Sequence, residues 1–370
     1  MAEHPESEVY VASQWKLMWW RFRKNKLALL GAVTMLLLYT MALFAPFFAP
    51  FQTTRFNAQY TYAPPQRLHL TDTTEDGSRV FRPWVTGFSS KVDPESLKRE
   101  FTPDESKKVP VRFFAEGYEY KQLGLFTTNR HLIGPVNPQD PMYLLGADKT
   151  GFDLLSRLIY GARISLSIGL VGVFLSLFLG VLLGGISGYY GGAVDTVIQR
   201  FIEFLIAIPT LPLWLGLAAA LPPGWSPLKV YFGITIILSL IGWTGLARVV
   251  RGRFLSLREE DFVTAARLDG SSELRIILRH MLPSFASHII ASITLAIPGV
   301  ILAETALSFL GLGLRAPIVS WGVLLQGAQN VRAIATAPWL LIPALMVMVT
   351  VMALYFLGDG LRDAADPYAA

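Results

Sequence analysis

Six long apolar runs alternate with polar segments along the chain, and they set the first expectation for the fold. The runs cover residues 27–49, 164–187, 201–221, 230–250, 285–310 and 338–357. A helix of about 20 apolar residues crosses the hydrocarbon core of a bilayer, so each run is long enough to span it. The pattern predicts an all-α polytopic membrane protein with six transmembrane helices and both termini on the same side.

Glycine and proline positions add detail to two of these runs. The second run is rich in glycines, which are Gly169, Gly172, Gly180, Gly184 and Gly185. Small residues let neighbouring transmembrane helices approach closely, so this run is expected to pack tightly. Pro209 and Pro212 interrupt the third run and predict a kink or break facing protein or a cavity, with a possible place in the gate or substrate path.

The polar segments divide the rest of the chain. The expected regions are an N-terminal interfacial segment (1–26), the first transmembrane helix (27–49), an insertion (50–153), a five-helix core (154–358) that contains a polar loop (251–284), and a tail (359–370). The insertion lacks an apolar run of transmembrane length, which predicts a soluble extracytoplasmic domain. Segments 111–114 and 118–125 suggest strands. Its role, as a structured spacer or as a domain for receptor contact or gating, stays open.

The polar loop is amphipathic and rich in arginine. Phe262, Ala265, Ala266 and Leu268 recur at helical spacing, which predicts a short amphipathic helix over Asp261–Leu268. A left-handed turn at the following Asp-Gly pair would end this helix.

A second amphipathic helix is expected after that turn. Ser271 or Ser272 can cap it, with Glu273 near its positive N-terminus. Its expected apolar side comprises Leu274, Ile276, Ile277, Leu278, Met281 and Leu282. Pro283 marks the start of a new segment, because a proline ring restricts the residue before it.

Composition and charge agree with a membrane protein. Of the 370 residues 52% are hydrophobic and 16% charged, whereas soluble domains carry about 25% charged residues. The net charge is +5. The polar loop and its approach hold Arg248, Arg251, Arg253, Arg258, Arg267, Arg275 and Arg279. Positive residues collect on the cytoplasmic side, so this loop and both termini are predicted to be cytoplasmic.

The segment before the first run is basic and aromatic, but it does not predict nucleic-acid binding. Residues 14–26 interleave tryptophans with lysines and arginines and lead directly into an apolar run. Such a flank is typical of the membrane interface. The chain contains no cysteine, which excludes disulfides and thiolate metal sites.

Sequence patterns of catalysis are missing. The chain has no G-x-x-x-x-G-K-[ST] phosphate loop and no G-x-S-x-G nucleophile elbow. Asp148 and Asp153 lie near the start of an expected amphipathic lead-in helix at 144–161, where two carboxylates are too few for a metal site and helix capping explains them better. The chain is therefore predicted to be non-catalytic and to bind no cofactor or metal itself.

Glu304 is a carboxylate deep inside an apolar run. Ionisable groups are costly in the bilayer and usually face a bundle interior or a water-filled cavity. Two interpretations stay open: a polar gate or substrate contact, and a structural hydrogen bond between helices.

The spacing within the polar loop resembles the cytoplasmic loop of ABC importer permeases. That loop follows the order E-A-A, three residues, Gly, nine residues, Ile-x-Leu-Pro. The matching positions here are Thr264, Ala265, Ala266, Asp269, Gly270, His280, Leu282 and Pro283. Thr264 stands in the place of the glutamate and His280 in the place of the isoleucine.

Other stretches are similar to permeases of the dipeptide type. They are LGADKTGFDLLSRLIYGARISL at 145–166, ETALSFLGLG at 304–313, Ser-Trp-Gly at 320–322 and LGDGLRDAADP at 357–367. The resemblance implies a type I importer permease of the oligopeptide/dipeptide class in the bacterial cytoplasmic (inner) membrane. It also implies a heterodimer with a homologous permease, two ATP-binding subunits that hold ATP and Mg and contact the 251–284 loop, and an extracytoplasmic substrate-binding protein.

The sequence leaves the cargo and two other function classes open. Members of the resembled family move peptides, but also oligosaccharides, nickel complexes and opines. The alternatives are an ion-gradient-driven secondary transporter, and a membrane receptor or assembly protein that acts through its outer domain. ATP dependence of transport in membrane vesicles separates these classes.

Overall fold

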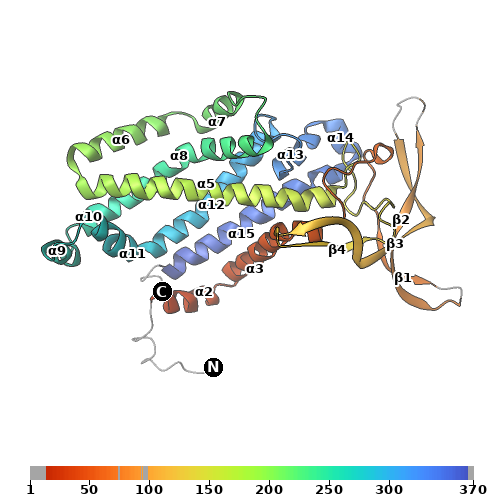
Figure 1. Cartoon of the computed structure of the whole chain (residues 1–370), viewed down its shortest axis with the longest axis horizontal. Helices are drawn as coiled ribbons and strands as arrows, with labels where there is room; N and C mark the ends of the chain where they lie inside the picture. The colour runs from red at the N-terminus through yellow and green to blue at the C-terminus, as the bar shows by residue number, and fades with distance from the viewer. Residues whose placement is uncertain (1–13, 74–75, 93, 95–98, 366–370) are drawn as a thin grey trace, which may run out of the picture. The chain divides into compact units, whose positions relative to one another are not determined.

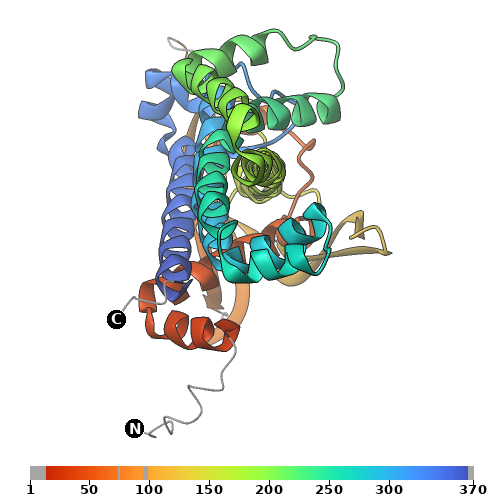
Figure 2. The ribbon, with the colours of Figure 1, turned by 90° about the vertical axis from the view of Figure 1, so that its left-hand side faces the viewer.

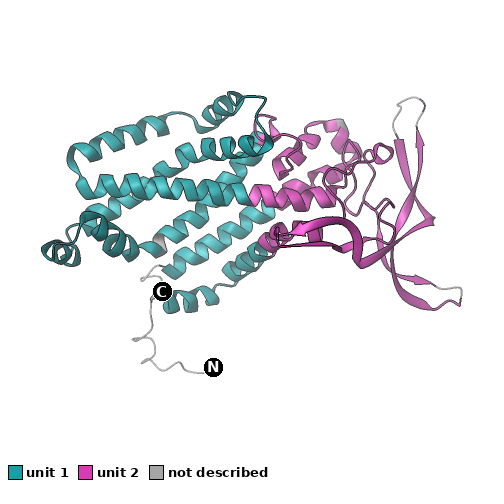
Figure 3. Cartoon of the chain, in the orientation of Figure 1, with its two compact units in different colours: residues 1–36, 167–307, 348–370 teal, residues 37–166, 308–347 magenta. Residues whose placement is uncertain are grey.

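A computed structural model describes residues 14–365 except 74–75, 93 and 95–98. The expected N-terminal segment and tail thus fall partly outside the described residues. The chain divides into two compact units, one within residues 1–36, 167–307 and 348–370 and the other within 37–166 and 308–347 (Figure 3). The first unit is helical, and the second combines helix ends with an antiparallel sheet.

Five of the described helical segments are long and apolar enough to cross a membrane (Figure 1). They are α3 (Lys26–Leu43), α5 (Leu154–Tyr190), α8 (Pro227–Leu257), the Ile289–Phe309 part of α12 (Ala286–Phe309), and η4 (Pro338–Leu341) together with α15 (Ile342–Ala365). The count becomes six if α6 (Gly192–Ala207) and α7 (Thr210–Ala219) form one broken span. The structure confirms a mostly helical protein with five to six apolar helices, but not an all-α one, because residues 68–135 contain a four-stranded sheet.

The expected break in the third apolar run is present. Helices α6 and α7 are bent by 84° at their junction. Pro209 is the N-cap of α7 and Pro212 lies in its first turn. Because proline has no backbone N–H to donate, it fits the first turn of a helix but not a helix interior.

The helices do not coincide with the expected runs at several places. The first run is divided into α3 and a short α4 (Ala45–Phe48). Helix α5 begins at Leu154, well before Ile164, and α15 continues to Ala365, beyond the expected start of the tail at 359. Hydropathy marks the part of a helix that is apolar, whereas the helix itself continues through polar residues as long as its backbone bonds persist.

Glycines of α5 make the close packing that the sequence predicts. A Cβ at Gly184 would lie 2.5 Å from the carbonyl oxygen of Ala247 in α8. A Cβ at Gly169 would lie 2.9 Å from Ile301 Cγ1 in α12. The absent side chains therefore allow α8 and α12 to pack directly on α5.

The second unit contains a four-stranded antiparallel sheet in the order β1-β2-β3-β4. The strands are β1 (Leu68–Thr73), β2 (Arg79–Val92), β3 (Arg99–Gln122) and β4 (Phe126–Pro135). Both segments that suggested strands fall within or at the end of β3. Phe51, Val85, Val111 and Met142 form a buried cluster on this sheet, so the 50–153 segment has a core of its own.

The expected lead-in helix over 144–161 is present only from Leu154, as the first turns of α5, and residues 144–153 before it form a turn. Asp148 accepts hydrogen bonds from the backbone N–H groups of Thr150 and Phe152 at 2.8 and 3.1 Å, and it pairs with Arg157. Asp153 accepts a bond from the Ser156 N–H at 2.7 Å and so caps α5. Capping is confirmed for Asp153. Asp148 instead holds the turn, because its carboxylate satisfies backbone donors that a helix would otherwise use.

The remaining elements are short. They are α2 (Gln14–Lys24), η1 (Ala58–Tyr60), α13 (Trp321–Leu325), η3 (Gln326–Gln329) and α14 (Val331–Thr336). Trp321 is fully buried, and its Nε1–H donates to the Leu158 carbonyl at 3.0 Å. Through this hydrogen bond the Ser-Trp-Gly stretch attaches the start of α13 to the first turns of α5.

Candidate functional site

The polar loop contains the short helix that its periodicity predicts. Helix α9 spans Asp261–Leu268. Gly270 has a φ of +73°, and the Gly270 and Ser271 N–H groups donate to the carbonyls of Arg267 and Ala266 at 3.0 and 3.1 Å. These two bonds close the helix in a Schellman motif, which needs a left-handed residue and so favours glycine.

The second helix of the loop contains a π-helical stretch. It consists of α10 (Glu273–Arg275), η2 (Ile276–Met281) and α11 (Leu282–Ser284). The Leu282 N–H donates to the Ile277 carbonyl, a bond between residues five apart. This wider turn directly precedes Pro283, whose ring would clash with a carbonyl in an ordinary α-turn. Ser272 occupies the N-cap position, but its side chain makes no capping hydrogen bond.

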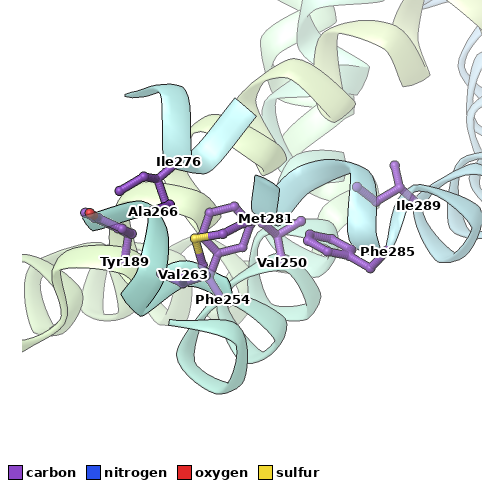
Figure 4. Packing of buried hydrophobic residues seen from close by; sticks show 9 residues of the cluster. All are labelled: Tyr189, Val250, Phe254, Val263, Ala266, Ile276, Met281, Phe285 and Ile289. Atoms are coloured by element: carbon purple, nitrogen blue, oxygen red, sulfur yellow. The ribbon is translucent and has the colours of Figure 1, made fainter. Parts of the chain in front are cut away.

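A buried apolar core joins the loop to three long helices. Val263 and Ala266 of α9 and Ile276 and Met281 of η2 contribute from the loop. The helix residues of this core are Tyr189 of α5, Val250 and Phe254 of α8, and Ile289 of α12, with Phe285 at the junction (Figure 4). Helix α9 thus shares one buried core with the ends of α5, α8 and α12.

Polar contacts support the same junction. The Tyr190 hydroxyl donates to Glu273 at 2.6 Å, and the Arg267 guanidinium lies 5.3 Å from the Tyr189 ring centroid. Arg251 of α8 forms a two-bond ion pair with Asp195 of α6, with both N–O distances at 2.5 Å. These contacts tie the α5–α6 turn to the helix that leads into the loop.

The residues whose spacing predicts α9 do not all lie on its buried side. Phe262 and Leu268 are 41% and 85% exposed, while Val263 and Ala266 are buried. Thr264 and Ala265 are exposed as well. Periodicity does not separate the two sides here, because apolar residues lie on both.

The other predicted loop residues are distributed around the turn and the second helix. Asp269 and Gly270 are exposed beside α9, and Pro283 is exposed at the end of the loop. His280 and Leu282 are half-buried. We refer to α9 and its closing turn, residues 261–270, as the docking ridge. It lies at the end of the first unit that faces the viewer in Figure 2.

The three predicted path residues do not share one environment. Glu304 is fully buried in α12, whereas Pro209 and Pro212 are exposed at the α6–α7 break. Within the described ranges, no group of three or more His, Asp or Glu side chains is placed to hold a metal ion.

A long apolar groove borders the loop. Its volume is about 890 Å³, and its walls come from α5, the second loop helix and α12. Phe178 and Ile290 are among its lining residues, and Glu273 and Tyr190 form its polar end.

These features define a class: a polytopic membrane protein whose helix bundle carries a partly apolar loop packed onto it through a buried core. The chain belongs to the family described as binding-protein-dependent transport system inner membrane component, which matches residues 180–369. Residues 13–65 also match the N-terminal TM domain of oligopeptide transport permease C. The chain is accordingly a multi-pass inner-membrane permease of this family.

Two curated relatives and one solved structure illustrate the similarity. The chain is 38% identical over 232 residues to the dipeptide transport system permease protein DppC of Bacillus subtilis, covering 62% of this chain and 70% of that protein. It is 30% identical over 356 residues to the oligopeptide transport system permease protein OppC of the same organism, covering 96% and 90%. An inward-facing structure of the MetNI methionine ABC transporter aligns with a TM-score of 0.43 at 16% identity, covering 56% of this chain and 95% of that chain.

Proposed function

We propose that this chain is the permease subunit of an ATP-driven ABC importer and forms half of a translocation pathway for peptides or a similar solute. The family match and the relatives named as dipeptide and oligopeptide permeases support this function. The observation that carries the mechanism is the attachment of the docking ridge to three long helices through one buried core.

In this proposal the docking ridge contacts an ATP-binding subunit. Phe262 and Leu268 supply the apolar contact, and Thr264, Ala265, Asp269 and Gly270 surround it. ATP and Mg are bound by the partner subunits, whose closure moves the ridge. The movement passes through Val263, Met281 and Phe254 into α5 and α8, which rock as a body to alternate the access of the pathway.

The remaining assembly follows from the same proposal. The chain crosses the membrane six times with α6–α7 as one broken span, both termini are cytoplasmic, and residues 50–153 face the substrate-binding protein. A homologous permease completes the pathway, and the apolar groove beside the loop is the surface it covers. The groove supports this pairing because its lining is apolar and comes from three elements of the helix bundle.

Glu304 is the proposed polar group of the pathway or of a helix contact. It is fully buried in α12, where an ionised carboxylate needs a polar neighbour. Glu304→Gln keeps the size and hydrogen-bonding capacity of the side chain. If transport and assembly are both unchanged in that variant, the gate role is wrong and a structural role remains.

Co-purification of the ATP-binding subunit tests the docking proposal. The double variant Gly270→Pro with Ala265→Asp breaks the left-handed turn and places a charge on the ridge, and we expect it to lose the ATPase. Leu268→Asp changes an 85% exposed side chain and so should leave the fold intact while weakening the complex.

Leu70→Asp is the matched control, because Leu70 is 49% exposed on β1, outside the loop. We expect it to retain the ATPase. Retention of the ATPase by Leu268→Asp and by the double variant at the level of Leu70→Asp would refute docking through α9.

A further inference from the structure

The hairpin formed by β3 and β4 ends in a turn made of exposed apolar side chains. Leu123, Leu125 and Phe126 are 46%, 81% and 59% exposed, and Phe114 farther down β3 is 59% exposed. Hairpin turns are normally built from glycine and small polar residues. Large apolar side chains in this position indicate that something apolar covers them.

Two of these exposed residues adopt a backbone conformation that is unfavourable for large side chains. Leu123 has a φ of +51° and Phe114 a φ of +54°, both in the left-handed region that bulky residues rarely adopt. The Leu125 N–H donates to the Gln122 carbonyl at 2.9 Å, which closes the turn around Leu123 and Gly124. A polar or glycine residue at 123 would relieve the strain, so the leucine indicates a role for its side chain.

Several contacts attach the hairpin to α4, which follows directly on the apolar helix α3. Both β3 and β4 pack against α4. His131 Nδ1 lies 2.8 Å from the carbonyl oxygen of Pro46, and the rings of Phe114 and Phe47 are 6.2 Å apart. The hairpin is therefore attached beside α4, where the first apolar segment ends. Its tip lies only about 15 Å beyond His131 along the strands.

The tip of the hairpin carries almost no charge, which suits a lipid surface better than water. Residues 122–129 contain no charged side chain, and Lys121 adjoins them. Arg130 farther along β4 is neutralised by Glu116 of β3 at 2.7 Å. Exposed leucine and phenylalanine side chains beside a single cation are typical of the boundary between lipid headgroups and acyl chains.

We propose that the turn Leu123–Phe126 inserts into the lipid leaflet that borders the end of α4, at the boundary between headgroups and acyl chains. In the proposed orientation of the chain this is the outer leaflet. The hairpin then anchors the sheet to the membrane at a second point beside α4. The inference goes beyond the transport function and depends only on α3 spanning the bilayer.

A single-cysteine labelling experiment tests the insertion, and the chain is suited to it because it contains no cysteine. Leu125→Cys is labelled with an environment-sensitive fluorophore in the purified assembly, reconstituted in phosphatidylethanolamine–phosphatidylglycerol vesicles. Quenching is then measured with spin-labelled lipid and, separately, with aqueous iodide. Leu70→Cys on the edge strand β1 is the control, since Leu70 is exposed and apolar but lies outside the hairpin.

Insertion predicts that spin-labelled lipid reduces the Leu125→Cys signal about twofold and iodide has little effect, with the reverse at Leu70→Cys. Adding Phe126→Asp to the Leu125→Cys protein should restore iodide quenching, because a charge disfavours the acyl boundary. Two results would overturn the proposal. In one, iodide quenches both positions equally. In the other, neither quencher reaches Leu125→Cys, which would indicate that a protein partner covers the tip.

Discussion

Gly184→Ala tests a close contact between α5 and α8 in the first unit. The added Cβ would lie 2.5 Å from the Ala247 carbonyl oxygen and 2.9 Å from the Ala247 Cα. Non-bonded carbon atoms settle about 3.5–4.0 Å apart, so α5 and α8 must separate locally by about 1 Å. The contacted atoms of Ala247 belong to the backbone, so no change of side-chain rotamer can relieve the clash. Overpacking of this kind costs about 1–3 kcal/mol of unfolding free energy.

Gly245→Ala in α8 is the matched control, because a Cβ there meets nothing within 4 Å. Both changes replace glycine by alanine within a helix, so the gain of about 1 kcal/mol in helix propensity cancels between the two variants. Thermal unfolding in one detergent measures the difference. We expect the Gly184→Ala midpoint to lie roughly 2–6 °C below that of Gly245→Ala. Equal midpoints would show that α5 and α8 do not approach closely at Gly184.

Three further predictions address other contacts. Burial raises the pKa of the Asp153 carboxyl to about 6, above its ordinary 3.8, so ionisation of this group opposes folding. The unfolding free energy should therefore fall as pH rises from about 4 through 6, by up to about 3 kcal/mol. Asp153→Asn should remove this loss and give a flatter profile of melting temperature against pH. His131 Nδ1 and Nε2 lie 2.8 and 3.1 Å from the carbonyl oxygens of Pro46 and Tyr118, and a neutral imidazole donates to only one such oxygen at a time. His131→Ala should therefore lose about 1 kcal/mol of unfolding free energy and speed amide hydrogen exchange in β3 and β4; unchanged exchange would contradict the attachment. Arg251→Gln should weaken its ion pair with Asp195 by about 1 kcal/mol, which a double-mutant cycle with Asp195→Asn measures as a coupling energy; zero coupling would show that the pair does not hold the α5–α6 turn.

Local sequence determined much of the helical framework and the position of the docking ridge. The apolar runs predicted helices of spanning length because hydrocarbon accepts only backbone that satisfies its own hydrogen bonds. Asp261–Leu268 and the left-handed turn at Gly270 agree with α9 and its closing motif. The broken third run followed from Pro209 and Pro212 for an equally local reason, since proline cannot donate a backbone hydrogen bond.

Only the tertiary structure decided which side of α9 faces inward. Val263 and Ala266 are buried because Phe254 and Met281 happen to lie beneath them, and this leaves Phe262 and Leu268 exposed. The Arg251–Asp195 pair and the attachment of His131 to Pro46 join residues far apart in sequence. Helical periodicity states which residues share a face, but the neighbour that covers a face comes from elsewhere in the chain, so a local pattern contains no information about it.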